Sequence, residues 1–167
     1  HFGNIVRPDI LMGTLSKALG AEGGYACASK VIIEYLKNKA RSFIFATSQT
    51  PATLAAALRA TEVLEEELQR AQNLQHNVEF FLNALHAEGV EAYSPTAIIP
   101  IIIGDEKSAL QVADELLANG VLAPAIRYPT VAKGTARLRV ALMATHTEAE
   151  LSQTVKLIGA AIRKYKK

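Results

Sequence analysis

The sequence predicts an α/β fold, because short apolar runs bounded by glycine, proline or charged residues alternate with longer amphipathic segments. Half of the 167 residues are hydrophobic and 20% are charged, which is the balance of a folded globular protein and not of a disordered one. A chain of this length can bury roughly 70% of its unfolded surface, enough for one domain or two small ones.

Three strands are predicted near the start of the chain, at 9–14, 23–28 and 42–47, where apolar runs are short enough for strands buried on both faces. Three such strands cannot cover themselves, so we expect their neighbours to lie upstream of His1. The chain also lacks an initiator methionine, and we expect it to be a fragment of a larger α/β protein. The single cysteine, Cys27, excludes an internal disulfide and is expected to be buried.

One long helix, straight or bent, is predicted for 51–89, where apolar residues recur mostly at steps of three or four. Thr50 suits its N-cap, Pro51 its first position and Gly89 its C-terminal stop. At about 1.5 Å per residue such a helix exceeds about 50 Å, which is too long for a compact small domain. We therefore expect 51–89 to connect a larger domain, whose last part is 1–50, with a small domain at 90–167.

The small domain is predicted to be α/β as well. A strand is expected at 98–103, followed by a helix that Asp105 caps and Gly120 ends. A second strand is expected at 137–143, where apolar and charged residues alternate over part of the run. The last helix begins with a capping box, Thr147-Glu148-Ala149-Glu150.

The charge and hydropathy of the sequence exclude several classes of function. The net charge is only +2, and the terminal lysines suit the end of a helix better than a nucleic-acid surface. No run approaches 18 apolar residues and no signal peptide precedes the first strand, so we expect a cytoplasmic protein without membrane or nucleic-acid partners. The four histidines are not at ligand spacing, and no metal is expected.

The most informative motif surrounds Lys17, in the run Asp9-Ile-Leu-Met-Gly-Thr-Leu-Ser-Lys-Ala-Leu-Gly-Ala-Glu-Gly-Gly-Tyr25. A lysine that follows an apolar strand, with hydroxyl neighbours and glycines after it, is poorly explained by packing. The ordinary alternative is a solvated surface lysine. A nucleotide phosphate loop is excluded, because there the lysine follows the glycines and directly precedes Ser or Thr.

GTLSKALG followed by GGY resembles the lysine segment of the α-oxoamine synthases, a branch of the fold-type I pyridoxal-phosphate (PLP) enzymes. Three further stretches in the same order support the resemblance, namely NKARSFIFATSQTPA, TAIIPIIIGD and APAIRYPTVAKGTARLRVALMATHT. The resemblance covers nearly the whole chain. It implies the end of a large PLP domain, a connecting helix and a small C-terminal domain, with PLP as cofactor.

Within this family the stretch from 123 to 139 is most similar to the enzymes that condense L-alanine with pimeloyl-CoA or pimeloyl-carrier protein in biotin biosynthesis, with loss of CO2. The nearest alternative is glycine C-acetyltransferase. Tyr128 stands where the most similar relatives usually have proline, and Ala132-Lys133 is also variable.

The resemblance implies a role for each site residue. Lys17 would carry PLP and act as the base for the substrate α-proton, for which its amine must be neutral. Thr14 would hydrogen-bond the PLP phosphate and Ser16 would assist, although both could simply cap a strand end. Thr47 and Ser48 would reach the phosphate of the neighbouring subunit's cofactor in a homodimer, whereas the alternative is that Ser48 and Thr50 only cap the helix.

Arg127 matches the arginine expected to bind the amino-acid carboxylate, and Thr130 matches a substrate-contacting threonine. A guanidinium suits that task because it is always charged and can bind a carboxylate through two bonds. Arg137 and Arg139 could compete for the role, but their alternation with Leu138 and Val140 favours strand positions, where they would be structural or face CoA.

The resemblance also implies an aspartate for the pyridine nitrogen, a histidine that stacks on the ring and a further substrate arginine, all of which would precede His1. We therefore expect this polypeptide alone to be inactive. A second hypothesis of another class is a self-standing α/β domain whose surface serves assembly.

Overall fold

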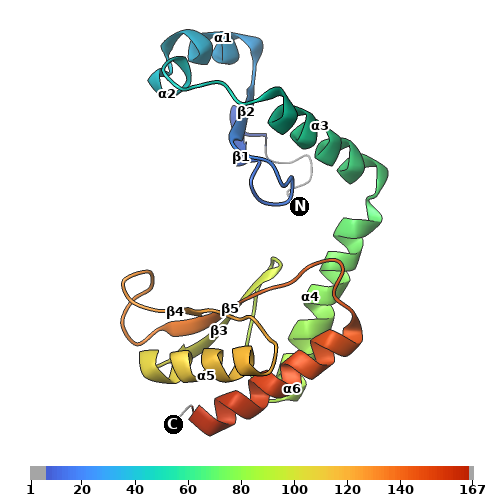
Figure 1. The fold of residues 1–167 in the computed structure, drawn as a ribbon, viewed down its shortest axis with the longest axis vertical. Helices are drawn as coiled ribbons and strands as arrows, with labels where there is room; N and C mark the ends of the chain where they lie inside the picture. Colours follow the sequence, from blue (N-terminus) through green and yellow to red (C-terminus); the bar gives the residue numbers. More distant parts are fainter. Residues whose placement is uncertain (1–6, 166–167) are drawn as a thin grey trace. The chain divides into compact units, whose positions relative to one another are not determined.

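The computed structural model describes residues 7–165, and the chain divides into two compact units, 1–67 and 68–167 (Figure 1). Unit 1 begins with an antiparallel hairpin in which Ile10 pairs with Ala28 and Thr14 with Gly24. Its elements are β1 (Ile10–Thr14), β2 (Gly24–Ala28), α1 (Lys30–Lys39), α2 (Arg41–Ile44) and α3 (Pro51–Glu66).

The strand predicted at 42–47 is wrong, since α2 and an irregular segment occupy this stretch. The Phe45 N–H donates to the Arg41 carbonyl at 3.0 Å and the Ile44 N–H donates to the Ala40 carbonyl at 3.0 Å, so local bonds replace those of a sheet. A short apolar run has no strand partner within the described part of unit 1, and a single turn of helix satisfies its backbone instead.

The predicted burial of Cys27 is also wrong, because this residue is exposed on β2. No layer covers either face of the two-stranded hairpin within the described residues of unit 1. Met12 on β1 is 74% exposed and Leu11, which pairs with Cys27, is 52% exposed. The two strands are therefore not buried on both faces in this chain.

The segment predicted as one helix forms two, α3 and α4 (Gln69–Ala87). Glu67 leaves the helical region at φ −121° and ψ 56°, and the two units divide at this point. Three consecutive glutamates at 65–67 place like charges at the C-terminal end of α3, where the helix dipole disfavours negative charge. The assignment of 51–89 as an interdomain connector stays a prediction.

The predicted ends of this segment are confirmed. The Thr50 hydroxyl accepts a hydrogen bond from the Thr53 N–H at 3.2 Å, and Pro51 opens α3. At the far end Gly89 has φ +76°, and the Val90 N–H donates to the Leu85 carbonyl at 2.9 Å. This pattern is a glycine-dependent helix stop.

Unit 2 is an antiparallel sheet with helices on one side (Figure 1). The strand order is β3-β5-β4, and its elements after α4 are β3 (Ile98–Gly104), α5 (Glu106–Ala118), β4 (Ala125–Ile126), β5 (Ala136–Ala141) and α6 (Glu148–Tyr165). Asp105 caps α5, accepting from the Ser108 N–H at 2.8 Å, and the Thr147 N–H donates to Glu150 Oε2 at 2.8 Å in the predicted capping box. Both predicted helix starts are confirmed.

The core of unit 2 lies between one face of this sheet and the helices. Ile99 and Ile101 of β3, Leu138 of β5, Leu116 of α5 and Ile158 of α6 are at most 1% exposed. Alternate residues point to the opposite face, which no helix of unit 2 covers. Among residues 7–165, no helix combines the length and apolar character needed to cross a bilayer.

Candidate functional site

Lys17 lies in the loop that joins β1 to β2. The hairpin continues past its last strand pair, because the Leu15 N–H donates to the Gly23 carbonyl at 2.9 Å and the Ala21 N–H donates to the Leu15 carbonyl at 3.0 Å. A turn then closes between Lys17 and Gly20, whose N–H donates to the Lys17 carbonyl at 3.0 Å. Lys17 therefore stands at the first position of a hydrogen-bonded turn.

Contacts with α3 fix this loop. Leu15 and Ala21 are each 8% exposed and form a small core with Ala57 of α3. The side-chain amide of Gln49 donates to the Glu22 carbonyl at 2.5 Å. The loop is thus anchored by apolar contact on one side and by a hydrogen bond on the other.

Gly23 is required at its position for two independent reasons. Its φ of +104° lies where L side chains are rarely found, and a Cβ added there would lie 1.5 Å from Gln49 Nε2. The close approach of the Gln49 side chain therefore depends on the absence of a side chain at this position.

Of the three side chains predicted to serve the cofactor here, those of Lys17 and Ser16 are in contact. Lys17 Nζ donates to the Ser16 hydroxyl at 3.1 Å, and Thr14 is the last residue of β1. All three side chains are exposed. Within residues 7–165 the Thr14 hydroxyl makes no hydrogen bond, so it does not cap the strand end.

Thr47 and Ser48 lie in the segment between α2 and α3 and are exposed. Thr50, and not Ser48, caps α3, because only the Thr50 hydroxyl accepts from the first turn of that helix. The hydroxyls of Thr47 and Ser48 are left without partners among the described residues. Their predicted contact with a neighbouring subunit's cofactor stays a prediction.

Arg127 and Thr130 form one turn in unit 2, directly after β4. The N–H groups of Thr130 and Val131 both donate to the Arg127 carbonyl, at 3.0 and 3.4 Å, and the Tyr128–Pro129 peptide bond within the turn is cis. Lys133 Nζ lies 5.1 Å from the centroid of the Tyr128 ring. Both predicted substrate residues, Arg127 and Thr130, are exposed and lie on the loop between β4 and β5.

Arg137 and Arg139 are strand residues, as their alternation predicted. In the register of the sheet Arg137 stands between Ile102 of β3 and Ile126 of β4, while Arg139 pairs with Pro100. Arg137 Nε donates to the Thr135 carbonyl at 3.0 Å. These side chains line a groove of about 390 Å³ on the uncovered face of the sheet.

The groove was not predicted from the sequence. Its walls come from the segment around Tyr93 and from three strands, so its residues are scattered over 93–139. The one local signal is the alternation of exposed and buried residues in β3, which marks Ile98, Pro100 and Ile102 as a second face.

The two groups of predicted site residues belong to different units. Thr14, Ser16 and Lys17 lie in unit 1, whereas Arg127 and Thr130 lie in unit 2. The first group stands on the β1–β2 hairpin and the second on the β4–β5 loop, while Thr47 and Ser48 precede α3 in unit 1.

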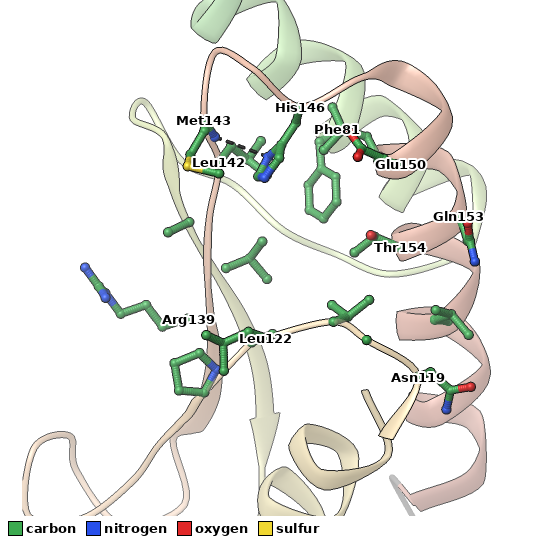
Figure 2. Close-up of a pocket in the computed structure, with 18 residues that line it drawn as sticks. Phe81, Asn119, Leu122, Arg139, Leu142, Met143, His146, Glu150, Gln153 and Thr154 are labelled. Carbon is green, nitrogen blue, oxygen red and sulfur yellow. Dashed lines mark hydrogen bonds between the residues drawn. The ribbon is translucent and has the colours of Figure 1, made fainter. Parts of the chain in front are cut away.

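A larger cavity, of about 570 Å³, lies in unit 2 between α6, the end of β5 and the segment 119–124 (Figure 2). Phe81, Leu142 and Thr154 point into it, and His146 Nδ1 accepts from the Met143 N–H at 3.2 Å (Figure 2). Glu150 on its wall is engaged in the capping box. Of the arginines and hydroxyl residues considered for the site, only Arg139 lines this cavity.

The buried amide of Asn77 fixes the turn beside that cavity. Its Nδ2 donates to the carbonyls of Met143 and His146, at 3.0 and 2.9 Å. Across residues 7–165, no group of three His, Cys, Asp or Glu side chains is placed to hold a metal ion.

The shifted carboxyl pKa values of unit 2 belong to structural contacts. Hydrogen bonds from Ser108 lower the pKa of Asp105, and hydrogen bonds from Thr147 lower that of Glu150, so both shifts come from helix capping. Hydrogen bonds from Lys164 and Tyr165 lower the pKa of Glu115, which joins α5 to α6. None of these groups lies on the loops of Lys17 or Arg127.

Comparison with known proteins gives consistent matches. The family model for aminotransferase class I and II matches residues 4–158. The chain is 48% identical to 8-amino-7-oxononanoate synthase 1 of Bacillus subtilis, over 95% of this chain and 41% of that protein. It is 46% identical to 8-amino-7-oxononanoate synthase of Geobacter metallireducens, over 95% of this chain and 41% of that protein.

Solved structures match as well. The 8-amino-7-oxononanoate synthase of Francisella tularensis has a TM-score of 0.81 at 30% identity and is matched over 93% of this chain and 46% of its own. Serine palmitoyltransferase of S. paucimobilis, solved with a bound PLP–myriocin aldimine, has a TM-score of 0.86 at 26% identity, over 94% of this chain and 40% of its own. The chain spans about two fifths of the length of the curated relatives it matches.

Proposed function

Because the chain belongs to the aminotransferase class I and II family, we propose that it works within an 8-amino-7-oxononanoate synthase, which condenses L-alanine with pimeloyl-CoA or pimeloyl-carrier protein. The observation that carries this proposal is the 48% identity with such a synthase over 95% of the chain. The serine palmitoyltransferase superposes well but is only 26% identical, which favours the synthase over that activity.

The Lys17 loop fits a PLP site. The cofactor's aldehyde requires a primary amine, and its phosphate requires hydrogen-bond donors. Lys17 offers an exposed amine on an anchored turn, and the hydroxyls of Thr14 and Ser16 stand on the same loop. When bound, PLP would supply an electron sink for the bond that breaks at the substrate α-carbon.

Lys17 serves twice in the proposed reaction. Its amine would hold the cofactor in the resting enzyme, and once displaced by the amine of L-alanine, Nζ would act as the base that takes the α-proton. The turn at 17–20 fixes the backbone from which the Lys17 side chain extends, and a base attached there would be held near the reacting carbon. A new carbon–carbon bond then forms at the acyl carbonyl, the thiol leaves, CO2 is lost, and Nζ returns a proton to the α-carbon.

Arg127 is proposed to bind the L-alanine carboxylate and Thr130 to contact the same substrate. Both are held in one turn, so their spacing is fixed by the backbone bonds to the Arg127 carbonyl. Within residues 7–165 no carboxylate pairs with the Arg127 guanidinium, which leaves its N–H groups for a substrate. Arg139, exposed on β5 behind this loop, remains the competing candidate.

We also propose a homodimer in which Thr47 and Ser48 contact the phosphate of the neighbouring subunit's cofactor. Their hydroxyls are not used by α3, which Thr50 caps. The α1 and α2 segments expose several large apolar side chains that a partner surface could cover, namely Val31, Tyr35, Phe43 and Phe45. A cytoplasmic location is proposed with it, in line with the single cysteine of the chain.

The proposal is tested with the complete synthase that contains this chain. Borohydride reduction in the presence of PLP should fix the cofactor on the peptide that carries Lys17, and CoA release should require both L-alanine and pimeloyl-CoA. Labelling elsewhere would contradict the assignment of Lys17. Faster CoA release with glycine and acetyl-CoA would favour glycine C-acetyltransferase instead.

A further inference from the structure

The groove on the uncovered face of the unit 2 sheet has the chemistry of a binding site. Its floor is formed by Ile98, Pro100 and Ile126, and the exposed ring of Tyr93 stands at its edge. Its volume of about 390 Å³ falls within the roughly 300–1,000 Å³ of small-ligand pockets. The apolar chain of a ligand could therefore pack against these apolar side chains.

Arg137 gives the groove a fixed positive charge. The register places Arg137 directly between Ile102 and Ile126, so apolar side chains flank it on both neighbouring strands. Its Nε donates to the Thr135 carbonyl at 3.0 Å, which orients the guanidinium. The terminal nitrogens of Arg137 have no acceptor among residues 7–165.

No acidic side chain of the surrounding sequence competes for this charge. Between Glu115 and Glu148 the chain contains no Asp or Glu, although it contains three arginines and one lysine. A carboxylate brought by a ligand would therefore meet an oriented guanidinium that no neighbouring carboxylate of this stretch neutralises.

We propose that this groove binds the acyl chain of a dicarboxylic acyl thioester, with the methylene groups on the isoleucines and proline and the terminal carboxylate on Arg137. The inference rests on the proposed function and adds the residues that select the acyl donor. Arg137 is the specificity-determining residue of the pair on β5, because its guanidinium is oriented by a hydrogen bond, whereas the side chain of the more exposed Arg139 makes no hydrogen bond within the described residues.

The position of the groove agrees with this role. Ile126 lines it and is followed immediately by Arg127, the proposed anchor of the L-alanine carboxylate. The acyl chain and the amino acid would thus approach from the same side of unit 2. A monocarboxylic chain of equal length would fill the same floor but would leave Arg137 without its partner.

The test compares pimeloyl-CoA with heptanoyl-CoA, which has the same seven carbons but no terminal carboxylate, in the complete synthase. Wild-type enzyme should prefer pimeloyl-CoA in kcat/KM by roughly tenfold or more, as expected for one charge-assisted bond. Arg137→Gln should lower kcat/KM for pimeloyl-CoA by a similar factor and leave that for heptanoyl-CoA within about twofold. The KM for L-alanine should not change.

A second variant, Ile102→Glu, tests the same contact even if Arg137→Gln fails to fold. Ile102→Glu places a carboxylate opposite Arg137 at a position that is 45% exposed, and it should remove the preference by occupying the guanidinium. Lys156→Gln, which removes a cation from α6 on the other side of the sheet, is the control and should keep the wild-type preference.

Three results separate the possibilities. If wild-type enzyme and L-alanine release neither CoA from either acyl-CoA nor the free carrier protein from pimeloyl-carrier protein, the proposed function itself fails. If it is active but shows no preference, or if either variant folds and keeps the preference, the groove does not bind the carboxylate. If Arg137→Gln raises the KM for L-alanine and lowers both acyl-CoA values equally, Arg137 only supports the Arg127 loop, and the inference is overturned.

Discussion

The side-chain amide of Gln49 donates to the backbone carbonyl of Glu22 and thereby ties the segment before α3 to the Lys17 loop. The bond passes over Gly23, where no side chain could be accommodated. The loop that carries Lys17 is thus held by a contact between two residues that are 27 positions apart.

Gly23→Ala should weaken PLP binding by the complete synthase. The substitution combines an unfavourable φ with a clash against Gln49, and a strained backbone position costs about 1–3 kcal/mol, so we expect PLP affinity to fall roughly 5- to 100-fold. PLP titration followed by absorbance measures it.

Gly120→Ala is the matched control for this prediction. Gly120 also has a positive φ, of +81°, but open space surrounds it and it lies in unit 2. Its substitution should lower thermal stability without changing PLP affinity. Equal PLP affinities of the two variants would show that the Gln49 contact does not shape the site.

Lys17→Ala should abolish borohydride labelling and lower kcat by at least about 10³-fold, since it removes both the attachment point and the base. Lys17→Arg keeps the charge but not the nucleophile and should be as inactive. Reduced peptide mapping and a CoA-release assay measure the two effects. A Lys17→Ala enzyme that still incorporated the label would place the cofactor on another lysine.

Arg127→Lys should raise the KM for L-alanine by roughly 10- to 100-fold, because lysine cannot form the two-bond contact with a carboxylate. Arg139→Lys is the direct comparison, and Thr130→Val should have a smaller effect of the same kind. Steady-state kinetics with varied L-alanine decide between the two arginines. A larger KM effect at Arg139 than at Arg127 would transfer the carboxylate role to β5.

The contact between α5 and α6 should make unit 2 less stable in acid. Glu115 accepts from Lys164 Nζ and from the Tyr165 hydroxyl, both at 2.7 Å, and these bonds lower its pKa. A carboxyl whose pKa is lower in the folded state stabilises the fold above its unfolded pKa, and this stabilisation is lost as pH falls through the folded value.

This contribution is measured by the difference in Tm between the wild-type chain and Glu115→Gln at several pH values. Wild type should have the higher Tm near pH 7, and the difference should shrink as the pH falls below about 4.3, the ordinary pKa of Glu. Asp114→Asn, on the same helix, is the control for general charge effects. A difference that stayed constant down to pH 2.5 would assign the stability to packing.

The 167-residue chain alone should not release CoA from pimeloyl-CoA in the presence of L-alanine. The expected partner of the pyridine nitrogen is not among its residues, so the electron sink would lack support. The assay is compared with the complete synthase at equal concentration. Alanine-dependent CoA release by the chain alone would show that these residues suffice.

Local features of the sequence predicted the local structure well. The caps at Thr50 and Asp105, the capping box at Thr147 and the stop at Gly120 all depend on neighbouring residues, and all are confirmed. The alternation around Arg137 predicted β5 for the same reason. A cap or a strand face is encoded within a few positions of the chain.

Features that depend on distant partners were not predicted. The run at 42–47 has strand composition, but a strand requires a neighbour to pair with, and α2 forms in its place. Cys27 is exposed because nothing in the described part of unit 1 covers it. The groove beside Arg137 arises from the pairing of Ile102 and Ile126 with β5, which no short motif encodes.

For the candidate site, the motif around Lys17 identified the loop but not its anchors. Leu15 and Ala57 meet across more than 40 positions of sequence, and only the fold brings them together. The two substrate candidates, Arg127 and Thr130, were found by resemblance, and the structure adds the turn that sets their spacing.

The cores of the two units are very unequal within the described residues: nineteen buried hydrophobic side chains form the core of unit 2, whereas Leu15, Ala21 and Ala57 form that of unit 1. Among the described residues, the lysine proposed to hold the cofactor is therefore carried by the unit with fewer buried apolar side chains. A ligand that binds only the folded form stabilises it in proportion to the logarithm of its concentration. In the 167-residue polypeptide, PLP bound at Lys17 would therefore protect unit 1 against added protease more than it protects unit 2.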